Sequence, residues 1–269
     1  MIGRRGLCLA AFIAVSVFST CLAPAQVPGP GAIGPPPLYP VEREGLWGYV
    51  DAAGHEVIPA QFEKAREFHE MLGAVRIRSH WAYIRPNGKI AVYPQFDEAW
   101  DFSEGLAAVC IGDKWGFIDR RGQMVIPLEF DYAMNFSHGL AAVNVGGLID
   151  GKWGYIDDSW QWTILPVYDE AWDFSEGLAR VRIGQKWGFI DVGGRIVVRP
   201  RYDDAGSLSK GLARVKKDGK WGYVDGSGKV VIPPRFDYAR DFTGGTARVR
   251  IGSGEATIDR TGKVLGGRP

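Results

Sequence analysis

Acidic side chains recur in short groups that could supply a general acid and a general base. Glycoside hydrolysis uses two carboxyl groups held at a fixed separation in a pocket. A catalytic pair should occur once, whereas these groups return at equivalent places in several repeats. We therefore interpret them as turn-capping and solvated residues, and we predict no catalytic residue and no enzymatic activity. The groups are Asp97, Glu98 and Asp101; Asp169, Glu170 and Asp173; and Asp237 with Asp241.

Residues that bind metals or cofactors form no recognised pattern. The four histidines are scattered, and Cys110 is the only cysteine beyond the N-terminal segment, which excludes an internal disulfide and argues against zinc. The acidic loops lack the dense Asp, Asn and Gly spacing of calcium loops. Neither a Gly-rich phosphate loop nor a Gly-x-Ser-x-Gly motif occurs. The sequence therefore predicts no metal and no cofactor, and we expect Cys110 to be buried.

Two sets of residues are candidates for binding. Exposed tryptophans outside the main repeat pattern would stack on sugar rings, and basic residues at equivalent places would form a stripe for an anionic polymer such as an acidic glycan. Core packing and ion pairing with acidic neighbours are the competing interpretations, and both are favoured over binding. The candidate aromatics are Trp100, Trp160, Trp162 and Trp172, and the candidate basic stripe is Arg180, Arg182, Arg214, Lys216, Arg248 and Arg250.

These residues are carried by a sequence repeat. Trp-Gly pairs, with Trp81-Ala82 in the same frame, recur at intervals of 34 residues, with one interval of 38 before Trp153. Six full repeats and a C-terminal half repeat fill the chain from residue 43 to its end. We expect the repeated tryptophans to be structural and buried, and the four extra residues near 146–149 to form a surface loop. The repeat tryptophans are Trp47, Trp81, Trp115, Trp153, Trp187 and Trp221.

Each repeat predicts short β-strands rather than helices. Gly and Pro residues interrupt the repeats at short intervals, so we expect no long helices. One strand contains Trp-Gly and ends in Asp-x-x-Gly, which is typical of a type I turn; a second ends in Val-Ile-Pro; a third reads Leu-Ala-x-Val-x-Ile. The segment 96–105 is compatible with a very short strand or with one helical turn. The Gly after each Trp is expected to allow a close backbone or ring approach.

This repeat resembles the WG-containing (KWG) repeat of bacterial proteins. The resemblance is carried by Lys114-Trp115-Gly116-Phe117-Ile118-Asp119, Gly122, Val125-Ile126-Pro127 and their counterparts in the other copies. It implies a β-rich fold, found in surface and exported proteins, with no general enzymatic activity. We predict an all-β tandem array of three- or four-stranded units, arranged as a solenoid or superhelix. The alternative is a closed, propeller-like toroid.

The N-terminal segment predicts export. Arg4 and Arg5 precede an apolar run and the small residues Ala23-Pro24-Ala25, so residues 1–25 are expected to be a signal peptide cleaved before Gln26. Residues 26–42 are a Pro-rich linker, and residues 43–269 are the repeat domain. The mature chain would be secreted or periplasmic, with no membrane span. The alternative is lipid anchoring at Cys21, in a poor lipobox.

Charge and composition narrow the function. Removing residues 1–25 leaves 30 basic and 31 acidic residues, which argues against a nucleic-acid partner. We predict a non-catalytic interaction or scaffolding module of the cell envelope, with a protein or an envelope glycan as its partner. The alternative is a glycan-binding or glycan-active protein that uses exposed aromatics and carboxylates.

Overall fold

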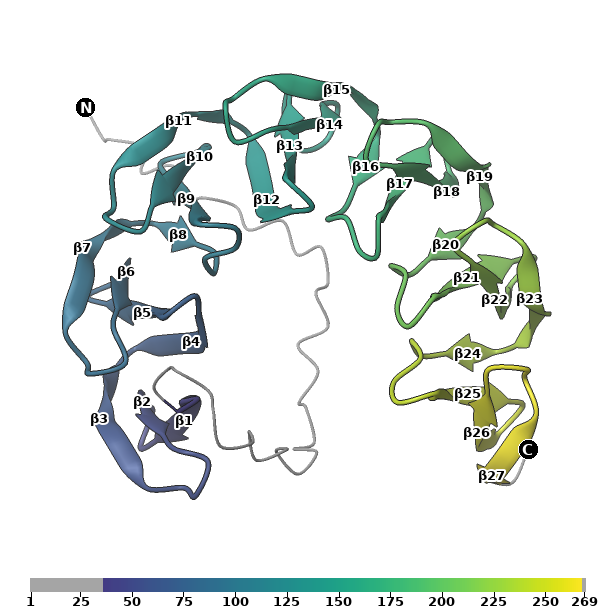
Figure 1. The fold of residues 1–269 in the computed structure, drawn as a ribbon, viewed down its shortest axis with the longest axis horizontal. Helices are drawn as coiled ribbons and strands as arrows, with labels where there is room; N and C mark the ends of the chain where they lie inside the picture. Colours follow the sequence, from purple (N-terminus) through teal and green to yellow (C-terminus); the bar gives the residue numbers. More distant parts are fainter. Residues whose placement is uncertain (1–35, 268–269) are drawn as a thin grey trace, which may run out of the picture. The chain divides into compact units, whose positions relative to one another are not determined.

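The computed structural model describes residues 36–267, all of which lie in strands and their connections (Figure 1). The signal peptide predicted for residues 1–25 and most of the predicted linker lie outside the described residues. The chain divides into two compact units, Met1–Asn135 and Phe136–Pro269. Each described sheet is built from strands that neighbour one another in chain order. The predicted all-β tandem array of three- or four-stranded units is therefore confirmed.

The first unit contains three complete sheets. In the first of these, β1 begins at Tyr39, so the last residues of the segment assigned to the linker pair with the first Trp-Gly strand. The sheets are β1 (Tyr39–Arg43), β2 (Leu46–Val50) and β3 (Glu56–Phe62); β4 (Lys64–His69), β5 (Leu72–Ile77), β6 (His80–Ile84) and β7 (Ile90–Phe96); and β8 (Glu98–Ala99), β9 (Leu106–Ile111), β10 (Lys114–Asp119) and β11 (Met124–Phe130).

The second unit contains four sheets of four strands, and the first strand of the first sheet crosses the unit boundary. The half repeat at the C-terminus supplies the last two strands of the final sheet. The sheets are β12 (Tyr132–Ser137), β13 (Leu140–Val145), β14 (Lys152–Ile156) and β15 (Trp162–Tyr168); β16 (Glu170–Ala171), β17 (Leu178–Ile183), β18 (Lys186–Asp191) and β19 (Ile196–Tyr202); β20 (Asp204–Ala205), β21 (Leu212–Lys217), β22 (Lys220–Asp225) and β23 (Val230–Phe236); and β24 (Tyr238–Ala239), β25 (Thr246–Ile251), β26 (Gly254–Asp259) and β27 (Val264–Gly267).

The glycine of the Trp-Gly pair is required by backbone crowding. The register between β18 and β19 shifts on both sides of Phe189, which marks a bulge in this antiparallel pair. A Cβ atom at Gly188 would lie 2.4 Å from the carbonyl oxygen of Val198, and one at Gly116 would lie 2.5 Å from that of Ile126. The predicted close approach is therefore an approach of backbone to backbone.

The Asp-x-x-Gly segment forms a capped turn. Oδ1 of Asp191 accepts hydrogen bonds from the backbone N–H groups of Gly193 at 3.1 Å and Arg195 at 2.9 Å, while Gly194 has a φ of 78°. This turn rests on the preceding sheet, because a Cβ atom at Gly194 would lie 3.2 Å from Cγ1 of Ile164. Gly194 is thus favoured by its positive φ, and its lack of a side chain avoids a tight contact with Ile164.

A lysine precedes four of the five Trp-Gly pairs, and each of these lysines forms an ion pair with the aspartate that follows the outer strand of its sheet. Nζ of Lys186 lies 2.5 Å from Oδ1 of Asp203, and Nζ of Lys220 lies 2.5 Å from Oδ1 of Asp237. The second oxygen of Asp237 accepts a 2.7 Å hydrogen bond from the backbone N–H of Gly252 in a hairpin turn. Each aspartate therefore joins the end of an outer strand to neighbouring turns.

Hydrogen bonds from side chains in the interior join neighbouring sheets within each unit. The hydroxyl of Tyr223 donates to the carbonyl oxygen of Arg240 at 2.7 Å, and its ring centroid lies 4.8 Å from that of Phe242. Burial raises the pKa of the Tyr223 hydroxyl far above its usual value, so the group remains a donor. The hydroxyl of Ser175 likewise donates to the carbonyl oxygen of Leu208 at 2.7 Å. Neighbouring repeats thus share one interior.

The repeat tryptophans are structural. Five are at most 7% exposed, and Trp47 in the first sheet is half-buried. The segment 96–105, for which a short strand and a helical turn were both compatible with the sequence, contains a strand. Glu98 and Ala99 form the two-residue strand β8, which pairs with β9. Cys110 is fully buried in β9, as expected. The extra residues before Trp153 lie in the connection between β13 and β14, where Ile149 is 94% exposed.

Candidate functional site

Trp160 occupies a turn position that belongs to glycine in every other repeat. Its φ of 61° lies in the left-handed region, where a non-glycine residue costs about 1–2 kcal/mol. Its side chain is 40% exposed, so burial does not account for the choice of tryptophan. Backbone strain of this kind tends to persist where a side chain is needed for function. The glycines at this position are Gly54, Gly88, Gly122, Gly194, Gly228 and Gly262.

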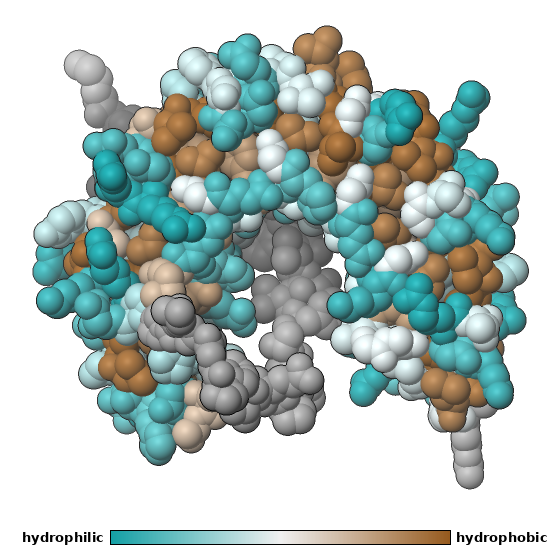
Figure 2. Space-filling view, in the orientation of Figure 1, coloured by the Kyte–Doolittle hydropathy of each residue, from teal (hydrophilic) through white to brown (hydrophobic). Residues whose placement is uncertain are grey.

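Three further apolar side chains on β15 are exposed. Trp162 is 38%, Leu165 65% and Val167 57% exposed. We call Trp160, Trp162, Leu165 and Val167 the β15 patch. At the place of Val167 other repeats carry polar residues such as Gln95, which makes this accumulation particular to β15. Figure 2 shows hydrophobic residues reaching the surface over the β14–β15 part of the sheet.

The β15 patch is suited to contact through side chains rather than through strand pairing. β15 is the outermost strand of its sheet, and an edge strand offers unpaired backbone groups to a partner. Pro166 lies in the middle of this edge and has no N–H to donate. A partner would therefore gain its free energy of binding mainly from burial of the four apolar side chains.

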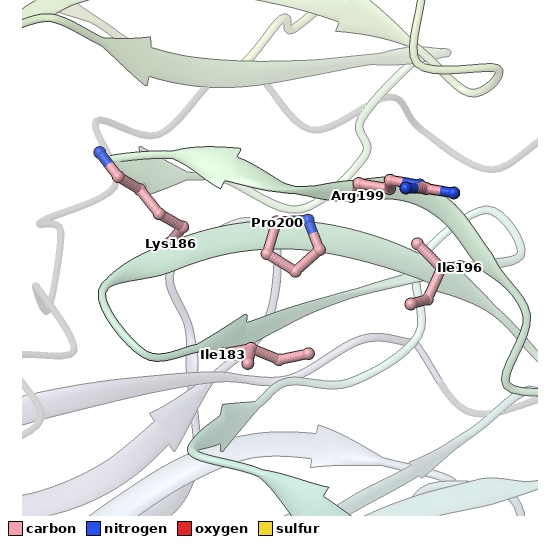
Figure 3. A pocket seen from close by; sticks show the side chains of 5 residues that line it. All are labelled: Ile183, Lys186, Ile196, Arg199 and Pro200. Carbon is pink, nitrogen blue, oxygen red and sulfur yellow. The ribbon is translucent and has the colours of Figure 1, made fainter.

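A groove lies along β19 in the next sheet. It has a volume of about 580 Å³ and is lined by Ile183, Lys186, Ile196, Arg199 and Pro200 (Figure 3). We call it the β19 groove. Ile183 and Ile196 are 46% and 51% exposed, so its lining combines apolar side chains with two cations. The turn that precedes β19 rests on Ile164, a buried residue of β15.

The candidate tryptophans Trp100 and Trp172 are half-buried and covered by arginines. The guanidinium of Arg66 lies 4.5 Å from the ring centroid of Trp100, and that of Arg180 lies 4.0 Å from the ring centroid of Trp172. Nε1 of Trp172 also donates to Oε1 of Glu170 at 3.0 Å. Of the four candidate aromatics, only Trp160 and Trp162 are exposed at the surface.

The candidate basic stripe is divided between internal contacts and solvent. Arg182 pairs with Glu170 at 3.1 Å, Arg214 pairs with Asp241 at 3.1 Å, and Arg180 donates to the carbonyl oxygen of Ala205 in the following sheet. Lys216 lies 5.9 Å from the ring centroid of Trp221. Arg248 and Arg250 are exposed on the last sheet. Arg180 and Arg214 thus join their sheets to the following ones, Arg182 pairs within its own sheet, and the C-terminal members Arg248 and Arg250 lie in solvent.

The carboxylates have two structural roles. Asp97, Asp169 and Asp237 accept hydrogen bonds from backbone N–H groups in hairpin turns. Asp173 lies between sheets instead, where its Oδ1 is inaccessible and lacks a hydrogen-bond partner among the described residues. Burial raises the pKa of Asp173 to about 7, although Arg180 opposes the shift. The burial of Asp173 differs from the expected solvated role, because a neighbouring sheet covers this position.

Metal ligands are not gathered anywhere in residues 36–267: this range contains no group of three or more His, Cys, Asp or Glu side chains placed to hold an ion. The histidines lie in turns and at strand ends, where Nε2 of His138 accepts a 3.2 Å hydrogen bond from the backbone N–H of Gly177. No helix within the same range has the length and apolar character needed to cross a membrane.

Sequence reasoning identified Trp160 and Trp162 but missed Leu165, Val167 and Arg199. A signal for these residues was present in the comparison between repeats. Arg199 stands where three other repeats have proline, and Leu165 is at the same position in its own repeat. A surface residue that departs from its counterparts without a role in the core is a candidate for a specific contact.

Comparisons with known proteins support the repeat assignment. The model of the WG containing repeat matches residues 47–79, 81–115, 115–148, 153–187, 187–221 and 221–253. No curated protein matches this sequence. Among solved structures, Hsv2 from Kluyvelomyces marxianus matches at 10% identity and a TM-score of 0.50 over 82% of this chain and 87% of that chain.

Other solved structures match less well. Hsv2p from Kluyveromyces lactis matches at 10% identity and a TM-score of 0.48, over 73% of this chain and 74% of that chain. PorZ, described as a bacterial surface component of the type-IX secretion system of Porphyromonas gingivalis, matches at 8% identity and a TM-score of 0.43, over 87% of this chain and 37% of that chain. At these identities the comparison concerns the fold alone, and the matched structures are β-propeller-like.

Proposed function

Because the chain belongs to the WG-containing repeat family, we propose that it is an exported, non-catalytic interaction module of the cell envelope. Its partner docks on the β15 patch. The observation that carries this proposal is Trp160, an exposed ring held at a φ of 61° where the other repeats have glycine. A tryptophan that strains its own turn and remains in solvent is better explained by a partner than by folding.

The chemistry of the patch favours a protein partner. Tryptophan is enriched among the residues that dominate binding energy at protein interfaces, and leucine and valine beside it extend the apolar area. An envelope glycan is the second candidate. Trp160 and Trp162 alternate with exposed Ser159, Gln161 and Thr163, whose polar groups would reach sugar hydroxyls while the rings stack on sugar faces.

The other repeats supply the variant that tests this proposal. Trp160→Gly, Trp162→Val and Leu165→Pro each introduce a residue that other repeats hold at the same position. The triple variant removes most of the patch while keeping the fold. The matched control is Tyr93→Pro, which changes an exposed residue of β7 to the proline found elsewhere at that position.

The wild-type chain, the triple variant and the control are compared for capture of proteins from an envelope extract and for retention on purified peptidoglycan. We expect a protein captured by the wild type and the control but lost by the triple variant. Patch-dependent retention on peptidoglycan alone would assign the glycan candidate. Binding that is equal in all three chains contradicts the proposal. Export is tested separately, by sequencing the N-terminus of the secreted chain, which we expect to begin at Gln26.

A further inference from the structure

The β19 groove carries a cation that the fold does not use. Arg199 is exposed and has no ion pair with any residue in the described range, whereas Lys186 in the same groove pairs with Asp203 at 2.5 Å. At the same repeat position three other repeats place a proline: Pro59, Pro127 and Pro233. Arg199 therefore occupies a position inside β19 without forming a salt bridge to another described residue.

The remaining lining of the groove is apolar. Ile183, Ile196 and Pro200 supply carbon surface, and Figure 3 shows Lys186 and Arg199 towards opposite ends of the groove with Pro200 between them. A ligand that satisfies this arrangement needs an anionic group for Arg199 and apolar groups for the isoleucines. Arginine presents several N–H donors in a planar fork that matches a carboxylate.

We propose that the β19 groove binds an extended acidic peptide segment of a partner protein, with a carboxylate on Arg199 and apolar side chains on Ile183 and Ile196. This inference rests on the proposed function as an interaction module and specifies the chemistry of its partner. The groove lies in the sheet that follows the sheet of the β15 patch in the chain.

Charge favours an acidic partner for this unit. Residues 136–267 contain 19 Lys and Arg against 16 Asp and Glu, whereas residues 36–135 contain 10 against 15. The second unit is thus the positively charged part of a chain that is nearly neutral as a whole. Complementary charge raises the rate of encounter and selects among partners.

The form of the groove favours a peptide over a fatty acid. An acyl chain gains affinity by burying all of its methylene groups, which requires an enclosed cavity, whereas the isoleucines here stay about half exposed along a strand. A peptide places separate side chains on such a surface. Pro200 removes a backbone donor from β19, so recognition depends on side chains rather than on strand addition.

The test uses a random peptide display library selected on the full-length chain. We expect enriched sequences in which Asp or Glu flanks apolar residues. Their synthetic peptides should bind Arg199→Glu at least about tenfold more weakly, as expected for loss of a charged hydrogen bond. Lys229→Glu is the matched control, because it makes the same charge change at an exposed residue outside the groove, and it should bind normally.

Three results would overturn the inference: no enriched peptide, enriched basic peptides, or acidic peptides that bind Arg199→Glu and wild type equally. If no peptide binds, and dodecanoate binds to the wild type but not to Arg199→Glu, the groove is a lipid site instead. If the partner captured by the wild type is lost in the β15 triple variant but kept in Arg199→Glu, the groove inference fails and the proposed function stands.

Discussion

Gly188 in β18 lies directly against the backbone of Val198 in β19, so that a Cβ atom on Gly188 would approach the Val198 carbonyl oxygen to 2.4 Å. No flexible side chain can move away to relieve this contact, because the crowded atom belongs to the backbone of the neighbouring strand. The glycine of the repeat motif is therefore a packing residue, although its own φ is ordinary.

We expect Gly188→Ala to lower the free energy of unfolding by about 1–3 kcal/mol, the usual cost of overpacking a filled interior. Chemical denaturation monitored by tryptophan fluorescence measures it. Gly226→Ala is the control, because the nearest atom to a Cβ there is 3.6 Å away, and its stability should be unchanged or slightly higher. Equal effects of the two substitutions would refute the backbone-crowding explanation.

The hydroxyl of Tyr223 contributes to stability through one hydrogen bond. It donates to the carbonyl oxygen of Arg240 at 2.7 Å, whereas Phe189, at the same position of the preceding repeat, has no hydroxyl. Tyr223→Phe keeps the ring and leaves this carbonyl without its donor, so we expect a loss of about 0.5–1.5 kcal/mol in denaturant unfolding. Because Phe189 already lacks this donor, Phe189→Leu should respond only through packing. A Tyr223→Phe variant as stable as the wild type would show that the hydrogen bond adds nothing.

Asp173 makes the stability of the chain depend on pH. In the unfolded chain it ionises near its ordinary pKa of 3.8, whereas burial raises its folded-state pKa to about 7. Between these values the unfolded state has released a proton that the folded state still binds, so stability falls as pH rises from about 4 to about 7. Asp173→Asn should remove this loss of stability. We expect it to raise the free energy of unfolding by at most about 4 kcal/mol at pH 8 and to leave it unchanged at pH 4.

Thermal unfolding at a series of pH values measures this difference. The control is Asp191→Asn, because a hydrogen bond from the Arg195 side chain lowers the pKa of Asp191. The ionised Asp191 side chain stabilises the folded state above its ordinary pKa, and this stabilisation is lost in acid. Asp191→Asn should therefore lower the stability of the protein at neutral pH. A pH profile of Asp173→Asn parallel to that of the wild type would mean that Asp173 ionises normally in the fold.

Features that depend on one repeat alone were predictable from the sequence, while features that depend on two were not. Asp191 and Gly194 have the residue types of a capped turn, and Gly188 signals a close approach. The strand at Glu98 and Ala99 has only two residues, too few for any periodicity, and exists because β9 pairs with it. The burial of Asp173 likewise depends on a neighbouring sheet. Arg199 is identified as unusual only by comparison with the prolines that three other repeats have at the same position.

Two substitutions at Trp160 separate the cost of its backbone conformation from the effect of removing its side chain. Trp160→Ala and Trp160→Gly remove the same ring, but only glycine relieves the φ of 61°. We therefore expect Trp160→Gly to be more stable than Trp160→Ala by about 1 kcal/mol in denaturant unfolding. At Ser159, which has no positive φ, the order should reverse, because glycine loses more conformational freedom on folding than alanine. If the alanine variant is the more stable one at both positions, the backbone at Trp160 is not strained. Backbone strain then no longer supports a binding role for the exposed ring.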